Sequence, residues 1–128
     1  MMDYLDIKQQ LQACRSKEDT FKTLVTLSKS LSRLSAEEKT EEHKVKGCES
    51  SVWLIVEERQ GLRYFKADSD AKLMRGVLLA ILSLVDGKNT NDLQKMDLTH
   101  QLTELNLSSY LTSSRSNGVL GILKRIQA

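Results

Sequence analysis

The chain has 128 residues and a formal net charge of +2, with 19 lysine and arginine residues interspersed among 17 acidic ones. This balance gives no electrostatic basis for binding nucleic acid or an anionic membrane, and we expect neither partner. The length and the hydrophobic content of 40% suit one compact domain over residues 1–128 of an ordinary soluble protein.

No apolar run approaches the roughly 20 residues that a bilayer-spanning helix requires. The first ten residues, MMDYLDIKQQ, contain acidic side chains and no continuous apolar region, so they do not resemble a secretory signal. We therefore expect a cytoplasmic location. Cys14 and Cys48 would stay reduced there, and two cysteines are too few for a disulfide framework.

Two amphipathic helices are predicted at the start of the chain. The apolar spacing from Leu5 to Cys14 suits a short helix, and the apolar residues from Phe21 to Leu34 mark a longer one. The polar residues 35–43 then finish the second helix or connect it to the next element. Both helices should pack on other parts of the molecule.

An antiparallel hairpin is predicted next. Residues 52–56 are β-branched or aromatic, residues 59–61 supply a turn, and residues 62–66 alternate weakly between polar and apolar. Residues 44–47 can add a short strand on one edge of this hairpin.

The central core element is predicted to be a helix with Ser69 as its N-cap and Gly87 as its stop, because apolar residues occupy nearly every face between them. Asp68 and Asp70 beside the cap suit the positive end of the helix dipole.

Three shorter helices complete the predicted order of elements. They run from Thr90 to Met96, from Leu98 to Leu105 and from Val119 to Ile126. Helices packed against one side of a small antiparallel β-sheet, which is an α+β fold, are the arrangement that this order favours.

The segment KVKGCESSVW, residues 44–53, places a cysteine where a nucleophile can move and be sheltered. Gly47 permits backbone conformations that are closed to residues with a Cβ. Val52 and Trp53 begin an apolar run behind Cys48. The sequence thus predicts a mobile thiol next to an apolar wall.

A positive environment would favour the reactive thiolate of this cysteine. Lys44 and Lys46 would share one face with Cys48 if the segment is extended, and Arg115 can contribute from a distance. The alternative for the two lysines is a solvated strand face. The residues alone also allow Cys48 to be a small buried hydrophobic side chain, and they favour a packed, unreactive thiol for Cys14.

The same segment, together with SDAKLMRGVLLAIL at 69–82 and LTSSRSNGV at 111–119, resembles the SufE/CsdE family of sulfur acceptors, which take persulfide sulfur from cysteine desulfurases. The likeness runs over most of the chain, and VDGKNTNDL at 85–93 leans toward the CsdE-like branch. The resemblance implies a SufE-like α+β fold. It also implies that Cys48 carries the persulfide on a loop that can place the thiol in a hydrophobic cavity.

On this interpretation the protein is a sulfur carrier rather than an enzyme, as a monomer or homodimer. It takes sulfur from a SufS-like or CsdA-like desulfurase, stimulates that enzyme and delivers sulfur to an iron–sulfur cluster scaffold or another acceptor. Gly47 gives the loop mobility, Val52 and Trp53 help to form the shelter, and Arg115 anchors a nearby turn or acts directly in transfer. The carrier needs no cofactor, because pyridoxal phosphate belongs to the desulfurase.

Three other functions are compatible with parts of the sequence. An adaptor that stimulates a desulfurase allosterically without carrying sulfur would need the same loop. A cysteine hydrolase would need a base, for which His43 and His100 are available, but no third orienting group is identifiable. A metal site would draw on the same histidines and the two cysteines, yet no paired spacing suits zinc or an iron–sulfur cluster, and we expect no metal.

Overall fold

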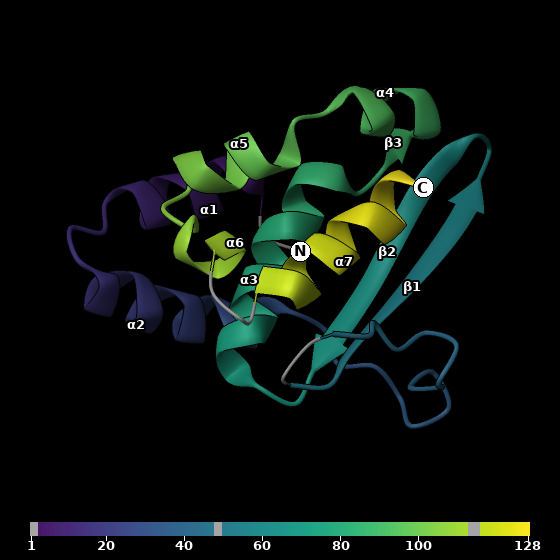
Figure 1. Ribbon diagram of the computed structural model, residues 1–128, viewed down its shortest axis with the longest axis horizontal. Helices are drawn as coiled ribbons and strands as arrows, with labels where there is room; N and C mark the ends of the chain where they lie inside the picture. The colour runs from purple at the N-terminus through teal and green to yellow at the C-terminus, as the bar shows by residue number, and fades with distance from the viewer. Residues whose placement is uncertain (1–2, 48–49, 113–115) are drawn as a thin grey trace.

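The computed structural model describes residues 3–47, 50–112 and 116–128, in which a small antiparallel sheet is packed against helices (Figure 1). Within these ranges the sheet has three strands in the order β1-β2-β3, and both pairings are antiparallel. The strands are β1 (Val52–Arg59), β2 (Leu62–Ser69) and β3 (Lys88–Asn89). The predicted α+β class is therefore confirmed.

The β1–β2 hairpin forms where the sequence predicts it. Val52 pairs with Ser69 at one end, and Gln60 and Gly61 form the turn at the other end. The two turn residues have positive φ angles of 55° and 79°. A two-residue turn of this left-handed kind matches the twist of the strands that it joins.

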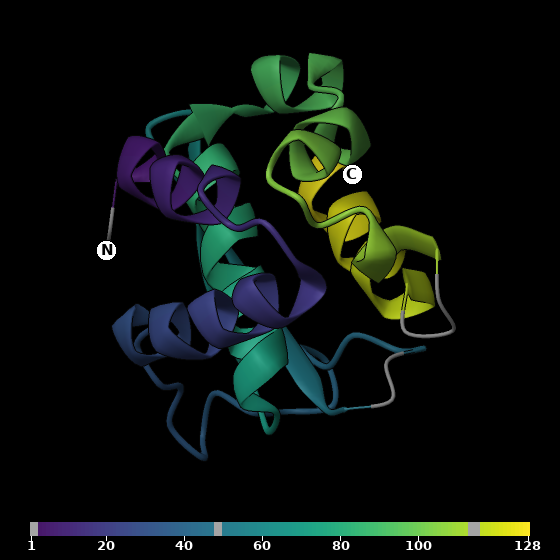
Figure 2. The ribbon, with the colours of Figure 1, turned by 90° about the vertical axis from the view of Figure 1, so that its left-hand side faces the viewer.

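Helix α3 (Lys72–Val85) lies at the centre of the core. Leu78, Leu79 and Ile81 point in different directions around the helix, and each is 0% exposed. Figure 2 shows α1 and α2 on one side of α3 and the later helices on the other. The helix ends at Val85, and Gly87 with φ of 78° is the predicted stop.

The start of α3 differs from the prediction. Its N-cap position is Ala71, and no side chain caps it there. Ser69 instead ends strand β2, where it is fully buried, and Asp68 precedes it in the strand with a buried carboxylate. The prediction of a Ser69 N-cap is wrong because the ladder between β1 and β2 extends as far as Ser69, opposite Val52.

The first helix, α1 (Tyr4–Gln12), agrees with the prediction, but the second ends early. Helix α2 (Lys17–Leu27) passes into the short 3-10 helix η1 (Ser28–Ser30), although the apolar spacing continues beyond it. Leu31 has an extended backbone, and its carbonyl accepts a hydrogen bond from the guanidinium of Arg75 on α3. The chain therefore leaves the helix where Arg75 binds it.

The later helices form a group on the other side of α3 (Figure 2). They are α4 (Thr90–Lys95), α5 (Leu98–Glu104), α6 (Ser109–Thr112) and α7 (Ser116–Gln127). Three of them match predicted helices, whereas the short α6 was not predicted. In the described ranges, none of the helices has the length and apolar character needed to cross a bilayer.

Candidate functional site

Residues 46–51, here called the Cys48 loop, contain the predicted sulfur-carrying cysteine. Cys48 itself and Arg115 lie outside the described residues. The structure does describe the two ends of the loop and the elements that hold them.

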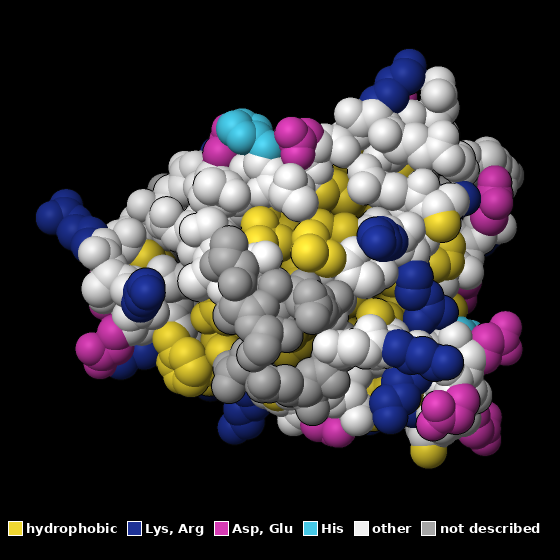
Figure 3. Space-filling view, in the orientation of Figure 1, with side chains coloured by type: hydrophobic (Ala, Val, Ile, Leu, Met, Phe, Trp, Pro, Cys, Tyr) yellow, Lys and Arg dark blue, Asp and Glu magenta, His cyan; other side chains and the backbone are white. Residues whose placement is uncertain are grey.

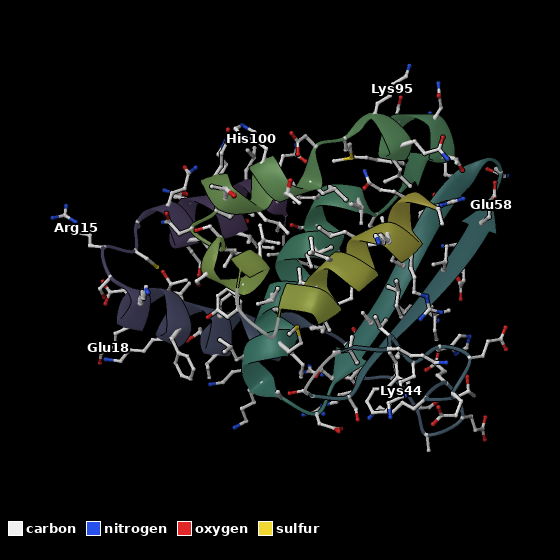
Figure 4. All side chains as sticks on the ribbon, viewed as in Figure 1. Arg15, Glu18, Lys44, Glu58, Lys95 and His100 are labelled. Atoms are coloured by element: carbon white, nitrogen blue, oxygen red, sulfur yellow. The ribbon has the colours of Figure 1, made fainter. Side chains whose placement is uncertain are left out.

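Backbone hydrogen bonds close the base of the Cys48 loop. The N–H of Val45 donates to the carbonyl of Val52 at 2.8 Å, and the N–H of Leu54 donates to the carbonyl of His43 at 2.8 Å. Lys44, labelled in Figure 4, forms the β-bridge to Trp53 between them. Residues 43–45 therefore run antiparallel to β1 along its outer edge, so the predicted edge strand is present at Lys44 but ends before Gly47.

Gly47 turns the chain at the start of the loop. Its φ angle is +92°, and a Cβ built on it would meet no atom within 4 Å. The left-handed backbone, and not a lack of space, is what requires glycine at this position. Because the backbone turns at Lys46 and Gly47, the extended segment that would align Lys44 and Lys46 on one face with Cys48 does not form.

The second end of the Cys48 loop is held by the junction of β2 and α3. The carbonyl of Ser51 accepts a hydrogen bond from Ser69 Oγ at 2.7 Å and from the N–H of Asp70 at 3.3 Å. Ser69 Oγ also accepts from the N–H of Ala71 at 3.2 Å. Sequence reasoning assigned Ser69 to helix capping and missed this support, because its partner Ser51 is distant in sequence.

The first end of the Cys48 loop is held by the C-terminal helix α7. The guanidinium of Arg125 donates to the carbonyls of Glu42 at 2.9 Å, Lys44 at 3.0 Å and His43 at 3.3 Å. Sequence reasoning missed Arg125, because a basic residue in the last turn of a helix is already explained by the helix dipole.

Gly121, one turn earlier on α7, also lies against the start of the loop. A Cβ built on Gly121 would lie 3.5 Å from Val45 Cγ1 and 3.7 Å from the carbonyl oxygen of Lys46. The loop base thus packs on the helix as well as on the edge of the sheet.

Val52 and Trp53 follow the loop at the start of β1. Val52 is fully buried in the core, whereas Trp53 is half-buried with Lys39 Nζ 5.0 Å from its ring centroid. Neighbouring residues of a strand point to opposite faces of a sheet. A shelter for Cys48 would therefore use one of these side chains and not both.

Asp68 provides a buried charge in the same part of the sheet, opposite Trp53 in the ladder. Its carboxylate accepts hydrogen bonds from the N–H groups of Leu34 at 3.1 Å and Ser69 at 2.8 Å, and it pairs with Arg75 at 2.5 Å. Burial raises the pKa of Asp68, but these donors together lower it by more. The pKa therefore lies below its ordinary value, and Asp68 is a charged structural residue.

A groove of about 430 Å³ with apolar and polar lining residues lies between the start of α5 and α7, and Gly121 lines it. Figure 3 shows hydrophobic side chains gathered between these two helices. Leu98 and Leu123 contribute buried side chains to it, and Leu120 is 36% exposed. Gly121 is thus shared by the groove and by the contact of α7 with the loop base.

Basic side chains gather on the same face of the molecule. Figure 3 shows Lys and Arg residues over α7 and over the segment that precedes β1. Lys46 and Lys124 are exposed, and the Arg125 guanidinium lies at the carbonyls of the loop base. Acidic side chains, among them the exposed Glu41 and Glu42, lie in the same segment, so this surface carries both signs of charge.

The other nucleophile and base candidates lie in different surroundings. The thiol of Cys14 is half-buried and lies 3.2 Å from Thr23 Oγ1. His43 Nδ1 lies 2.8 Å from the carbonyl oxygen of Glu38, and His100 Nε2 lies 2.8 Å from a Glu104 carboxylate oxygen on exposed α5. Among the described residues, no group of three His, Cys, Asp or Glu side chains is arranged to hold a metal ion.

Fold and site together define an α+β protein with a cysteine-bearing loop fixed at both ends to the sheet and to the helices. Residues 5–128 match the family model of the SufE Fe-S metabolism associated domain. The chain therefore belongs to the SufE family.

Similar proteins agree with this assignment. The chain is 33% identical over 114 residues to an uncharacterised SufE-like protein of Rhizobium etli, covering 86% of this chain and 77% of that protein. It is 30% identical over 115 residues to an uncharacterised SufE-like protein of Rhizobium meliloti, covering 87% and 82%. The solution structure of a hypothetical protein from Thermus thermophilus has the same fold, with a TM-score of 0.72, 13% identity and coverage of 97% and 90%.

Proposed function

We propose that this protein is a sulfur carrier in which Cys48 takes persulfide sulfur from a cysteine desulfurase. The Cys48 thiolate attacks the outer sulfur of the persulfide on the donor cysteine. The sulfur–sulfur bond of the donor breaks, the donor cysteine leaves as a thiolate, and a new sulfur–sulfur bond forms on Cys48. The carrier then passes this sulfur to an iron–sulfur cluster scaffold or another acceptor.

The observation that supports this proposal most is the way the Cys48 loop is attached. Its base is closed by the hydrogen bond from Val45 to Val52, and its ends are tied to α7 through Arg125 and to the end of β2 through Ser69. A carrier must extend a thiol into a second protein while its own fold stays intact. A short loop with a glycine at its turn and a fixed base suits that task.

Membership of a family associated with Fe–S metabolism also supports the proposal. The partner would be a SufS-like or CsdA-like desulfurase, stimulated by the carrier, and the segment VDGKNTNDL favours the CsdE-like branch. Pyridoxal phosphate would belong to that enzyme, and the carrier would need no cofactor. We further propose that the chain works as a single cytoplasmic domain and that Arg115 supports the loop or the transfer.

The groove beside α7 is our proposed shelter for the persulfide between transfers. Its leucine side chains, Leu98, Leu120 and Leu123, would shield the outer sulfur from water, and Gly121 both lines the groove and lies against the loop base. Basic residues near the loop, such as Lys46, would favour the attacking thiolate.

The test is the intact mass of the protein after incubation with a pyridoxal phosphate-dependent cysteine desulfurase and free cysteine, without reductant. We expect added mass of whole sulfur atoms that thiol reagents remove. Cys48→Ser should gain none, and the matched control Cys14→Ser should gain as much as the unaltered protein. Sulfur on Cys48→Ser would refute the assignment of Cys48.

The same variant separates a carrier from an allosteric adaptor. If Cys48→Ser still raises the rate at which the desulfurase releases alanine from cysteine, the protein stimulates without carrying sulfur. A carrier loses its stimulation, because the persulfide on the enzyme is no longer discharged. We expect this loss.

A further inference from the structure

We propose that Arg125 is a positioning residue for the Cys48 loop; the effect on sulfur transfer rests on the function proposed above. Its guanidinium donates to the carbonyls of three consecutive residues, Glu42, His43 and Lys44, at 2.9 to 3.3 Å. These carbonyls belong to the segment that leads directly into the loop. Arg125 thus fixes where the loop begins relative to α7.

The geometry requires arginine in particular. A guanidinium offers donors from two terminal nitrogens in a rigid plane: here Nη1 bonds the carbonyls of His43 and Lys44 while Nη2 bonds that of Glu42. The ammonium of a lysine has a single nitrogen, so it cannot bond all three carbonyls from two separate positions as the guanidinium does. The carbonyl of His43 also accepts from the N–H of Leu54, so β1 and α7 hold the segment from two sides.

Helix α7 does not depend on Arg125 for its own attachment. Val119, Ile122 and Ile126 are each 0% exposed and bury the apolar face of the helix in the core. Arg63 of β2 donates to the carbonyl of Ile126 at 2.9 Å, which ties the end of the helix to the sheet independently. Loss of the Arg125 side chain should therefore loosen the loop base and leave the fold in place.

The first test is hydrogen exchange of the Val45 amide, which donates across the loop base to Val52. We expect Arg125→Ala to speed this exchange by about tenfold, because the base opens more often when one of its two supports is gone. Arg125→Lys should recover only part of the protection. The matched control Arg63→Ala removes an arginine that binds a carbonyl of the same helix, and it should leave Val45 exchange unchanged. Amides of α3 serve as the internal reference for the fold.

The second test is sulfur transfer with a cysteine desulfurase at varied carrier concentration. Arg125→Ala should lower the maximal rate by about tenfold, because a thiol that is poorly placed in the docked complex reacts slowly. The half-saturating concentration should change by less than about twofold, because the guanidinium binds loop carbonyls and not the partner. Arg63→Ala should transfer normally.

Two results would overturn the inference: unchanged exchange at Val45 in Arg125→Ala, or faster exchange with an unchanged maximal rate of transfer. If the unaltered protein takes no sulfur, the proposed function fails separately. Exchange at Val45 would then still decide whether Arg125 positions the loop.

Discussion

At the scale of single residues, Asp68 and Arg75 form a buried ion pair with side-chain exposures of 0% and 5%. Arg75 Nη2 also donates to the carbonyls of Ser28, at 3.0 Å, and Leu31, so one guanidinium joins β2, α3 and both ends of η1. Removal of one partner from a buried pair is costly, since it leaves the other charge without compensation. This pair therefore fixes the path of the chain between α2 and the sheet.

Because of this pair, the free energy of unfolding should depend on pH in the acid range. The pKa of Asp68 is lower in the folded protein than in the unfolded chain, where an aspartate has a pKa of about 3.9. Its contribution is therefore complete above that value and is lost as the pH falls through the folded pKa. We expect the free energy of unfolding, measured by urea denaturation between neutral pH and pH 2, to decline in this acid range.

Asp68→Asn is the matched variant for this prediction. It should unfold with about 3 kcal/mol less free energy at neutral pH, because Arg75 loses its buried counterion. The variant should also lose the part of the acid dependence that Asp68 supplies. Parallel pH profiles of the two proteins would contradict this account.

The sequence predicted some residues of the site and not others, for a physical reason. Gly47 could be predicted because the requirement for glycine comes from the backbone conformation of that residue alone, its positive φ angle. Such a requirement is local and does not depend on a distant partner. Ser69 and Arg125 act through partners that lie 18 and 81 residues away in sequence, Ser51 and Lys44. A short sequence pattern does not reveal contacts between residues so far apart, so the roles of Ser69 and Arg125 at the loop were not predicted.

At the scale of the elements, α2 and α3 meet with their backbones in close contact. A Cβ built on Gly76 of α3 would lie 2.2 Å from the carbonyl oxygen of Leu24 on α2. Backbone cannot move aside as a flexible side chain can. Gly76 therefore sets the spacing between the two helices.

Gly76→Ala should destabilise the protein by about 2 kcal/mol, because the helices must separate to admit a methyl group. The usual gain in helix propensity from glycine to alanine, up to about 1 kcal/mol, would offset only part of this cost. Gly121→Ala on α7 is the control, since its Cβ would make ordinary contacts at 3.5 and 3.7 Å. Thermal unfolding should show a lower midpoint for Gly76→Ala and no loss for Gly121→Ala. Equal midpoints for Gly76→Ala and the unaltered protein would contradict the close approach.

The hairpin and α3 were predicted well from the sequence. The hairpin follows from the β-branched and aromatic run at residues 52–56 and the turn at residues 59–61, and α3 follows from the apolar run before Gly87. The prediction failed where a tertiary contact overrides the local pattern. The second helix stops before Leu31 because Arg75 binds the chain there, and the strand extends to Ser69 because it pairs with β1.

At the scale of the whole molecule, few large hydrophobic side chains of the described residues are exposed. Among the described residues they lie on four different elements: Leu5 on α1, Phe21 on α2, Val56 on β1 and Leu120 on α7. A stable homodimer buries a total area of roughly 1,200 Å² or more, of which four exposed side chains can supply only a small part.

We therefore expect a monomer. Sedimentation equilibrium should give the mass of one chain, 14.5 kDa, at micromolar concentration. A mass that rises toward twice this value with protein concentration would show a dimer and direct attention to the faces around Phe21 and Leu120.

The closed base of the Cys48 loop also sets the length of a tether. Cys48 follows Val45 by three residues, and a fully extended chain advances by no more than about 3.6 Å per residue. While the bond from Val45 to Val52 holds, the Cα atom of Cys48 therefore stays within about 11 Å of Val45. If Cys48 takes up sulfur as proposed, a partner has to bring its donor sulfur to within that radius and one side chain beyond it. On that proposal, the short tether would select partners whose reactive sulfur lies at a shallow depth and would exclude donors recessed further inside.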